Sequence, residues 1–255
     1  MNTTTPPFAR PAVLTGRVHR LGGEILLDEG TSWCPPGVHQ REPVSAYLIK
    51  GDHGAVLVDT GIRLHEAGIL AQLDELLDPD EPLSIVLTRT EMECCLNIPA
   101  IEEHHRIDAV WYTGGITVPR SAAPAQRISV EPGTWREMEV REGITLHFIS
   151  PLLRLLPTLW VFDPASGALL TSDAFTHLAP QSEDTAPADP TGGLHKFRWF
   201  GDADTGSIAA DVRQIVRDRS VAAIGPGYGW PVTGTDACRR EAERLAVCLE
   251  EVGAQ

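Results

Sequence analysis

The stretch TRTEMECCLNIP, at Thr88–Pro99, is the most informative part of the sequence for the fold. It begins at the end of an apolar run, SIVLT at Ser84–Thr88, whose length and β-branched residues are typical of a buried strand. It leads into Ile98–His105, which we expect to be a short helix. The loop between this strand and this helix therefore gathers side chains that can hold charge or a metal ion, namely Arg89, Glu91, Glu93 and Cys94.

The segments before this loop favour a hairpin followed by a helix. Val44–Lys50 and Ala55–Asp59 are apolar runs separated by Gly51–Gly54, a sequence typical of a tight turn between two strands. In Leu64–Leu77 the leucines and Ile69 recur at helical spacing, and a proline two residues later ends the pattern. Together with the following strand, these segments form a βαβ-like unit.

Strands dominate the rest of the chain. Before the hairpin, Arg17–Leu27 is expected to form two short strands around Gly22-Gly23, because paired glycines usually mark a turn. The later expected strands are Ile107–Tyr112, Ile128–Val130, Trp135–Val140, Ile144–Ile149, Thr158–Asp163, Ala168–Ser172 and Val221–Ile224, and the later expected helices are Ser207–Arg219 and Thr235–Val252. This order favours an α/β fold with two sheets sandwiched between helices.

Composition limits the remaining choices. A chain of 255 residues with 42% hydrophobic content fits one domain, which we place at residues 13–255 after a flexible N-terminal tail at residues 1–12. The net charge of -14 repels nucleic acid and anionic membrane surfaces, and no apolar run is long enough for a membrane span. We therefore expect a cytoplasmic protein with neither partner. The five cysteines lack CxxC spacing, which argues against a disulfide framework.

The motifs around this loop resemble those of the metallo-β-lactamase superfamily in its flavodiiron version. Thr88–Pro99 resembles the metal loop Thr-His-x-Glu-x-Asp-His, and Glu91 matches the glutamate that marks the flavodiiron type. Further landmarks follow in family order: the strand Ser45–Lys50, the turn Val58–Gly61, the segment Pro151–Leu159, the Asp-Ala-Phe motif at Asp173–Phe175 and the closing turn Pro226–Gly229. The resemblance spans residues 44–231 and implies an αββα sandwich of the metallo-β-lactamase type.

The resemblance also implies where the family's metal ligands would lie, and most of these positions have changed. Arg89, Glu91, Glu93 and Cys94 stand at the ligand positions of the first loop, and Arg154, Asp173 and Tyr228 stand at the later ones. An arginine offers no lone pair to a metal ion. We therefore expect no dinuclear site. The resemblance to flavodiiron proteins also implies a C-terminal flavodoxin domain, which this sequence does not contain, so oxygen or nitric oxide reduction is not expected.

Three roles for the altered pocket stay open. In the first, Arg89 and Arg154 replace the metal ions electrostatically and pair with Glu91, Glu93 and Asp173 in a structural network. In the second, an Arg-lined pocket with Asp173 and Trp160 binds a small organic anion or performs metal-free acid–base chemistry, with Glu91, Glu93 and Tyr228 as catalytic candidates. In the third, Glu91, Glu93, Cys94 and Asp173, with His195 as a further candidate, hold one iron, zinc or manganese ion.

The function expected from these observations is a pseudoenzyme or a small-molecule binding module without a cofactor. The alternative is an enzyme that uses the remodelled pocket on a small acidic substrate, either without a metal or with a single ion. Because flavodiiron-like domains commonly pair, the resemblance further implies a homodimer or a heterodimer with a related chain.

Overall fold

The computed structural model describes residues 10–28, 39–114, 120–151, 158–175 and 204–253. The strands in these ranges are β1 (Ala12–Thr15), β2 (Val18–Leu27), β3 (Gln40–Gly51), β4 (Gly54–Val58), β5 (Leu83–Leu87), β6 (Ile107–Tyr112), β7 (Ala125–Arg127), β8 (Arg136–Arg141), β9 (Ile144–Ile149), β10 (Trp160–Asp163), β11 (Ala168–Ser172), β12 (Ala223–Pro226) and β13 (Val232–Thr233). The helices are η1 (Arg63–His65, a 3-10 turn), α1 (Glu66–Leu76), α2 (Met92–Cys95), α3 (Ile98–His104), α5 (Thr205–Asp218) and α6 (Thr235–Gly253).

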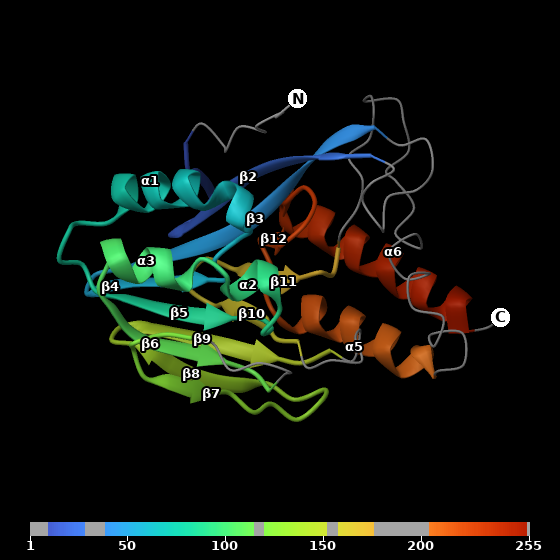
Figure 1. Cartoon of the computed structure of the whole chain (residues 1–255). Helices are drawn as coiled ribbons and strands as arrows, with labels where there is room; N and C mark the ends of the chain where they lie inside the picture. The colour runs from blue at the N-terminus through green and yellow to red at the C-terminus, as the bar shows by residue number, and fades with distance from the viewer. Residues whose placement is uncertain (1–9, 29–38, 115–119, 152–157, 176–203, 254–255) are drawn as a thin grey trace.

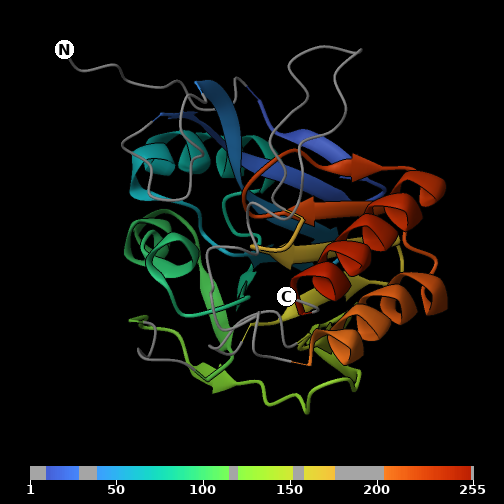
Figure 2. The same ribbon diagram turned by 90° about the vertical axis from the view of Figure 1, so that its right-hand side faces the viewer.

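The strands form two sheets that lie between two layers of helices (Figure 1). The first sheet has seven strands in the order β1 to β7, and the second has six in the order β13-β12-β11-β10-β9-β8. Helices α1 and α3 cover the outer face of the first sheet, and α5 and α6 cover the second, as the turned view shows (Figure 2). The expected αββα sandwich is therefore confirmed.

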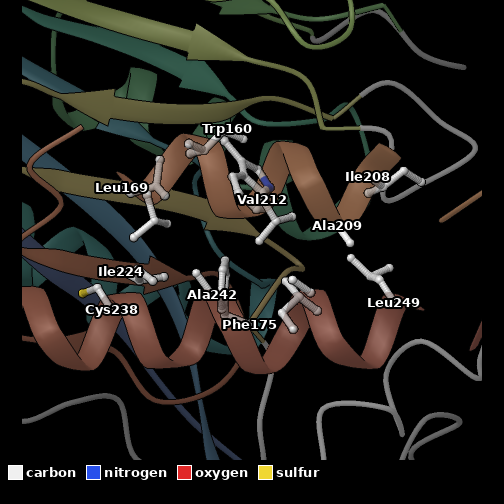
Figure 3. Packing of buried hydrophobic residues seen from close by; sticks show 14 of the residues in the cluster. Trp160, Leu169, Phe175, Ile208, Ala209, Val212, Ile224, Cys238, Ala242 and Leu249 are labelled. Atoms are coloured by element: carbon white, nitrogen blue, oxygen red, sulfur yellow. The ribbon is translucent and has the colours of Figure 1, made fainter. Parts of the chain in front are cut away.

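Each interface between layers has its own apolar core. Between the two sheets, residues such as Tyr47, Val86 and Phe148 pack together, while Leu73, Ile85 and Ile101 lie between the first sheet and its helices. The third core lies under α5 and α6, where Val212 and Leu249 face Leu169 and its neighbours (Figure 3). The helix pair α5–α6 thus covers the outer face of the second sheet.

Strand β2 corrects one expectation from the sequence. Instead of two short strands around Gly22-Gly23, the chain continues as one strand through both glycines. Gly22 has a φ of 118°, and the side-chain amide of Gln72 both accepts from its N–H and donates to its C=O, at 2.8 and 3.1 Å. Helix α1 therefore satisfies the buried backbone groups of Gly22, which lies beyond the pairing of β2 with β1, so no turn is needed there.

Smaller differences concern strand limits. The strand expected at Ile128–Val130 lies three residues earlier, at β7, and the strand expected from Val221 begins at Ala223. β1 begins at Ala12, the last residue of the expected tail, and residues 1–9 lie outside the described ranges. Within those ranges, no helix is both long enough and apolar enough to cross a membrane.

The fold brings the carboxyl ends of β4, β5 and β11 to the same region. β4 and β5 are parallel neighbours in the first sheet, so their last residues lie side by side. β11 runs in the facing sheet, and a hydrogen bond between Thr88 and Ser172 connects its end to that of β5. The loop at Thr88–Pro99 begins where these strand ends meet.

Candidate functional site

The centre of the candidate site is the Arg89 side chain, which is 4% exposed. Its Nη1 donates to Oε2 of Glu91 at 3.2 Å and to Oδ2 of Asp173 in a short contact, and its Nε donates to Sγ of Cys94 at 3.4 Å. The carboxylates of Glu91 and Asp173 are 30% and 29% exposed. One buried guanidinium group thus joins three side chains at positions where the family resemblance implied metal ligands.

Beneath Arg89, a buried chain of hydrogen bonds joins the two sheets. The Asp59 carboxylate accepts from the backbone N–H and from the hydroxyl of Thr88, at 2.8 and 2.7 Å. The Thr88 hydroxyl is also 2.9 Å from the hydroxyl of Ser172. Burial raises the pKa of Asp59 to about 6, although the bonds from Thr88 and the charge of Arg89 act against this rise. Asp59 thus braces the loop, the role that its place at the end of the first hairpin suggests.

Backbone strain gathers at the same place. Among the described residues, the non-glycine positions with a positive φ are Asp59 at 58°, Ser172 at 54° and Phe175 at 61°. Such conformations cost of order 1–3 kcal/mol each and persist where surrounding contacts enforce them. Two of the three belong to the hydrogen-bonded chain, and the third follows Asp173 by two residues. Contacts with the surrounding structure, and not local backbone preference alone, therefore hold these residues in their conformations.

The loop itself is held by Thr60 and Asn97. The N–H and the hydroxyl of Thr60 both donate to the carbonyl of Cys94 at 2.9 Å. The side-chain amide of Asn97 donates to the carbonyls of Thr60, Gly61 and Ile62 at 2.8 to 3.2 Å. This anchoring fixes the direction in which Cys94 and Arg89 enter the site.

Tyr228 lies in a backbone connection between the two sheets. The N–H of Ser45 donates to the carbonyl of Gly227 at 2.8 Å, and the N–H of Gly229 donates to the carbonyl of Pro43 at 2.9 Å. We call these two segments, residues 43–45 and 227–229, the clasp. The clasp holds Tyr228 opposite Val44 of β3, and it lies close to Ser172 because the N–H of Gly227 donates to that residue's carbonyl at 2.7 Å.

The other expected site residues lie elsewhere or outside the described ranges. Trp160 is 1% exposed and packs in the core under α5 and α6, where its ring centroid is 5.6 Å from that of Phe175 (Figure 3). Its ligand-binding role stays a prediction, since apolar packing accounts for its position. Arg154 and His195 lie outside the described residues, as does the side chain of Glu93.

The sequence analysis assigned no chemical role to Thr88 or Ser172, which the structure places in the site. Thr88 and Ser172 are the links between Asp59 and the Asp173 segment, and both are buried. The sequence feature that could have pointed to Thr88 is its place as the first residue of the loop. The feature that could have pointed to Ser172 is its position next to Asp173.

The described side chains do not fit a dinuclear iron centre. Such a centre needs imidazole and carboxylate donors that converge on each ion, whereas Arg89 extends a cation into this position. Within the described ranges, no three Asp, Glu, His or Cys side chains are grouped in a way that could hold a metal ion. The described carboxylates instead converge on a guanidinium group.

Comparison of the whole structure with solved structures defines the class of fold as the metallo-β-lactamase type. A metallo-β-lactamase from Pontibacter korlensis is 14% identical with a TM-score of 0.59, and the match covers 94% of this chain and 98% of that chain. No protein-family model matches the sequence, and no curated protein matches it significantly.

Within this class, the chain is similar to flavodiiron cores. Rubredoxin oxygen:oxidoreductase from Desulfovibrio gigas is 14% identical with a TM-score of 0.68 over 94% of this chain. A metal-soaked flavodiiron core from Synechocystis is 15% identical with a TM-score of 0.66, also over 94% of this chain. This chain covers 61% and 60% of those two chains. At such identities the likeness establishes the fold alone.

Proposed function

We propose that this chain is a metallo-β-lactamase-fold domain that works without a dinuclear metal centre, as a pseudoenzyme or small-molecule binding module. The observation that carries the proposal is the contact of the Arg89 guanidinium group with Glu91 and Asp173. A fixed positive charge at this point offsets carboxylates that would otherwise repel each other.

The chemistry of arginine supports a permanent replacement. Arginine stays protonated at every physiological pH and cannot supply a lone pair to a metal ion. Its donors bind carboxylates in a fixed planar geometry, so the carboxylates of Glu91 and Asp173 are already occupied by the chain itself. The Cys94 thiol is likewise in contact with Arg89.

The contacts of Arg89 with Glu91 and Asp173 also affect how a ligand could bind. Because Arg89 is engaged by the chain's own carboxylates, an organic anion would have to compete with Asp173 for the guanidinium group. A ligand of this site would therefore either displace that ion pair or bind beside it. The anion, the dimer and the cytoplasmic location remain predictions.

Elemental analysis of protein purified without chelator tests the proposal. We expect less than about a tenth of an equivalent of iron, zinc or manganese, because a guanidinium group takes the place of the cations. The Arg89→Ala variant, purified in parallel, serves as the control for metal that the remaining side chains can hold. Near-stoichiometric metal in the parent protein would contradict the proposal and favour a mononuclear enzyme.

A further inference from the structure

Glu42 of β3 is a buried carboxyl group that the site described above does not use. Its exposed fraction is 0%, and neither carboxyl oxygen has a hydrogen-bond partner in the described part of the chain. Buried carboxylates are nearly always paired with a cation or with hydrogen-bond donors, because an isolated buried charge is very costly. The burial of the Glu42 carboxyl group without a partner therefore has to be explained.

The position of Glu42 next to the clasp suggests an explanation for its burial. Glu42 directly precedes Pro43, the first residue of the clasp, and pairs with Ile25 of β2 on its other side. The clasp connects β3 of one sheet to the turn after β12 of the other. A movement of this end of β3 would therefore displace Tyr228, which pairs with Val44. It would also displace Gly227, whose N–H donates to the carbonyl of Ser172.

We propose that Glu42 is a buried proton-binding site that controls the clasp. With its proton, the carboxyl group is neutral and remains buried while the clasp is closed. Without the proton, the charged group is driven toward water, which draws this end of β3 away from residues 227–229. Glu42 and the clasp lie apart from the contacts of Arg89, so this control would operate whether or not that site holds a metal.

The surroundings of Glu42 favour the neutral form. Burial raises the pKa of Glu42 to about 8, and burial is the only cause of this rise. Within the described part of the chain, the charged or titratable groups on the elements beside Glu42 include Glu24 of β2, Arg41 of β3, His65 before α1 and Tyr228 in the clasp. Arg41, the nearest cation in the sequence, is directed to Glu24 at 3.9 Å and is 56% exposed.

Proton linkage gives the expected size of the effect. An open clasp exposes Glu42 and returns its pKa to the ordinary value of 4.5, whereas the closed clasp keeps it at about 8. Between these values the closed state holds one proton that the open state has lost. The open fraction should therefore rise about tenfold for each pH unit in this range.

Amide hydrogen exchange at Ser45 and Gly229 measures this opening directly, since both N–H groups are bonded within the clasp. After correction for intrinsic exchange rates, we expect protection of these amides to fall about 100-fold between pH 5.5 and pH 7.5. Glu42→Gln, which mimics the neutral form, should remove this dependence. Glu24→Gln, on the neighbouring strand, should leave it intact.

Two results would overturn the inference. One is protection in the parent protein that is unchanged over this pH range, or that falls equally in Glu42→Gln. The other comes from the parent alone, should the variant fail to fold: nuclear magnetic resonance of 13C-labelled glutamate must reveal one carboxyl group that titrates well above the ordinary value of 4.5, and its absence contradicts the proposal.

Discussion

The Thr88 side chain joins the two sheets at the candidate site. Its hydroxyl group lies between Asp59 at 2.7 Å and Ser172 at 2.9 Å, and its carbonyl accepts from the N–H of Leu159. A threonine hydroxyl has one hydrogen, so it can donate to only one of its two neighbours. With Asp59 ionised, the chain runs from Ser172 through Thr88 to the carboxylate.

Replacement of Thr88 by valine tests this role, because it keeps the side-chain shape and removes the hydroxyl group. We expect a loss of about 1–3 kcal/mol in the free energy of unfolding, since Asp59 and Ser172 each lose a buried partner. Thr134→Val is the control, because the Thr134 hydroxyl bonds an exposed carbonyl. Equal urea midpoints for both variants would argue against a structural role for Thr88.

Single positions also set the limit of what the sequence could predict about the site. The contacts of Arg89 with Glu91 and Asp173 are those expected from their places in the motifs. The Thr88–Ser172 bond joins residues 84 positions apart in two different sheets, and no local pattern records such a meeting. The same holds for Glu42, which reads in sequence as an ordinary charged residue before a strand.

Among the elements, β2 depends on a partner that is distant in sequence. A Gly-Gly pair inside an apolar segment locally favours a turn. Gln72, fifty positions later on α1, satisfies the free edge at Gly22 and lets the strand continue. By contrast, the hairpin β3–β4, the strands β6 and β9 and the three long helices followed the local pattern, because their apolar faces match the layer they cover.

Gly22→Ala should therefore destabilise β2 strongly. Besides requiring a φ of 118°, an added Cβ would lie 2.2 Å from the carbonyl oxygen of Val44, so the strand pair must move apart. We expect a loss of at least about 2 kcal/mol in chemical denaturation. Gly143→Ala is the matched control, because Gly143 also has a positive φ of 75° but nothing within 4 Å, and its cost should be about 1–2 kcal/mol. Similar losses at both positions would mean that the close approach to Val44 is unimportant.

For the molecule as a whole, the architecture is retained although few residues are shared with proteins of the same fold. At 14% identity to the Desulfovibrio gigas protein, the apolar layers still assemble into the same sandwich over 94% of the chain. Such layers require only apolar residues of suitable size at periodic positions, whereas a metal site requires particular donor atoms. The fold could therefore be predicted from pattern and motif order, while the chemistry of the pocket had to be argued from individual substitutions.

We infer that the Arg89 guanidinium group holds the candidate site together electrostatically. Chemical denaturation of Arg89→Met tests it most directly, since methionine keeps much of the apolar stem. We expect a loss of about 2–4 kcal/mol at unchanged slope, below the largest values for buried pairs because Glu91 and Asp173 are partly exposed.

Arg213→Met is the matched control, because Arg213 also binds two carboxylates, those of Glu243 and Glu250, on the exposed surface of α5 and α6. Surface ion pairs add little to stability, so its midpoint should barely move. A large loss for Arg89→Met and a small one for Arg213→Met is the predicted result. An Arg89→Met variant that unfolds at the same denaturant concentration as the parent would contradict the claim.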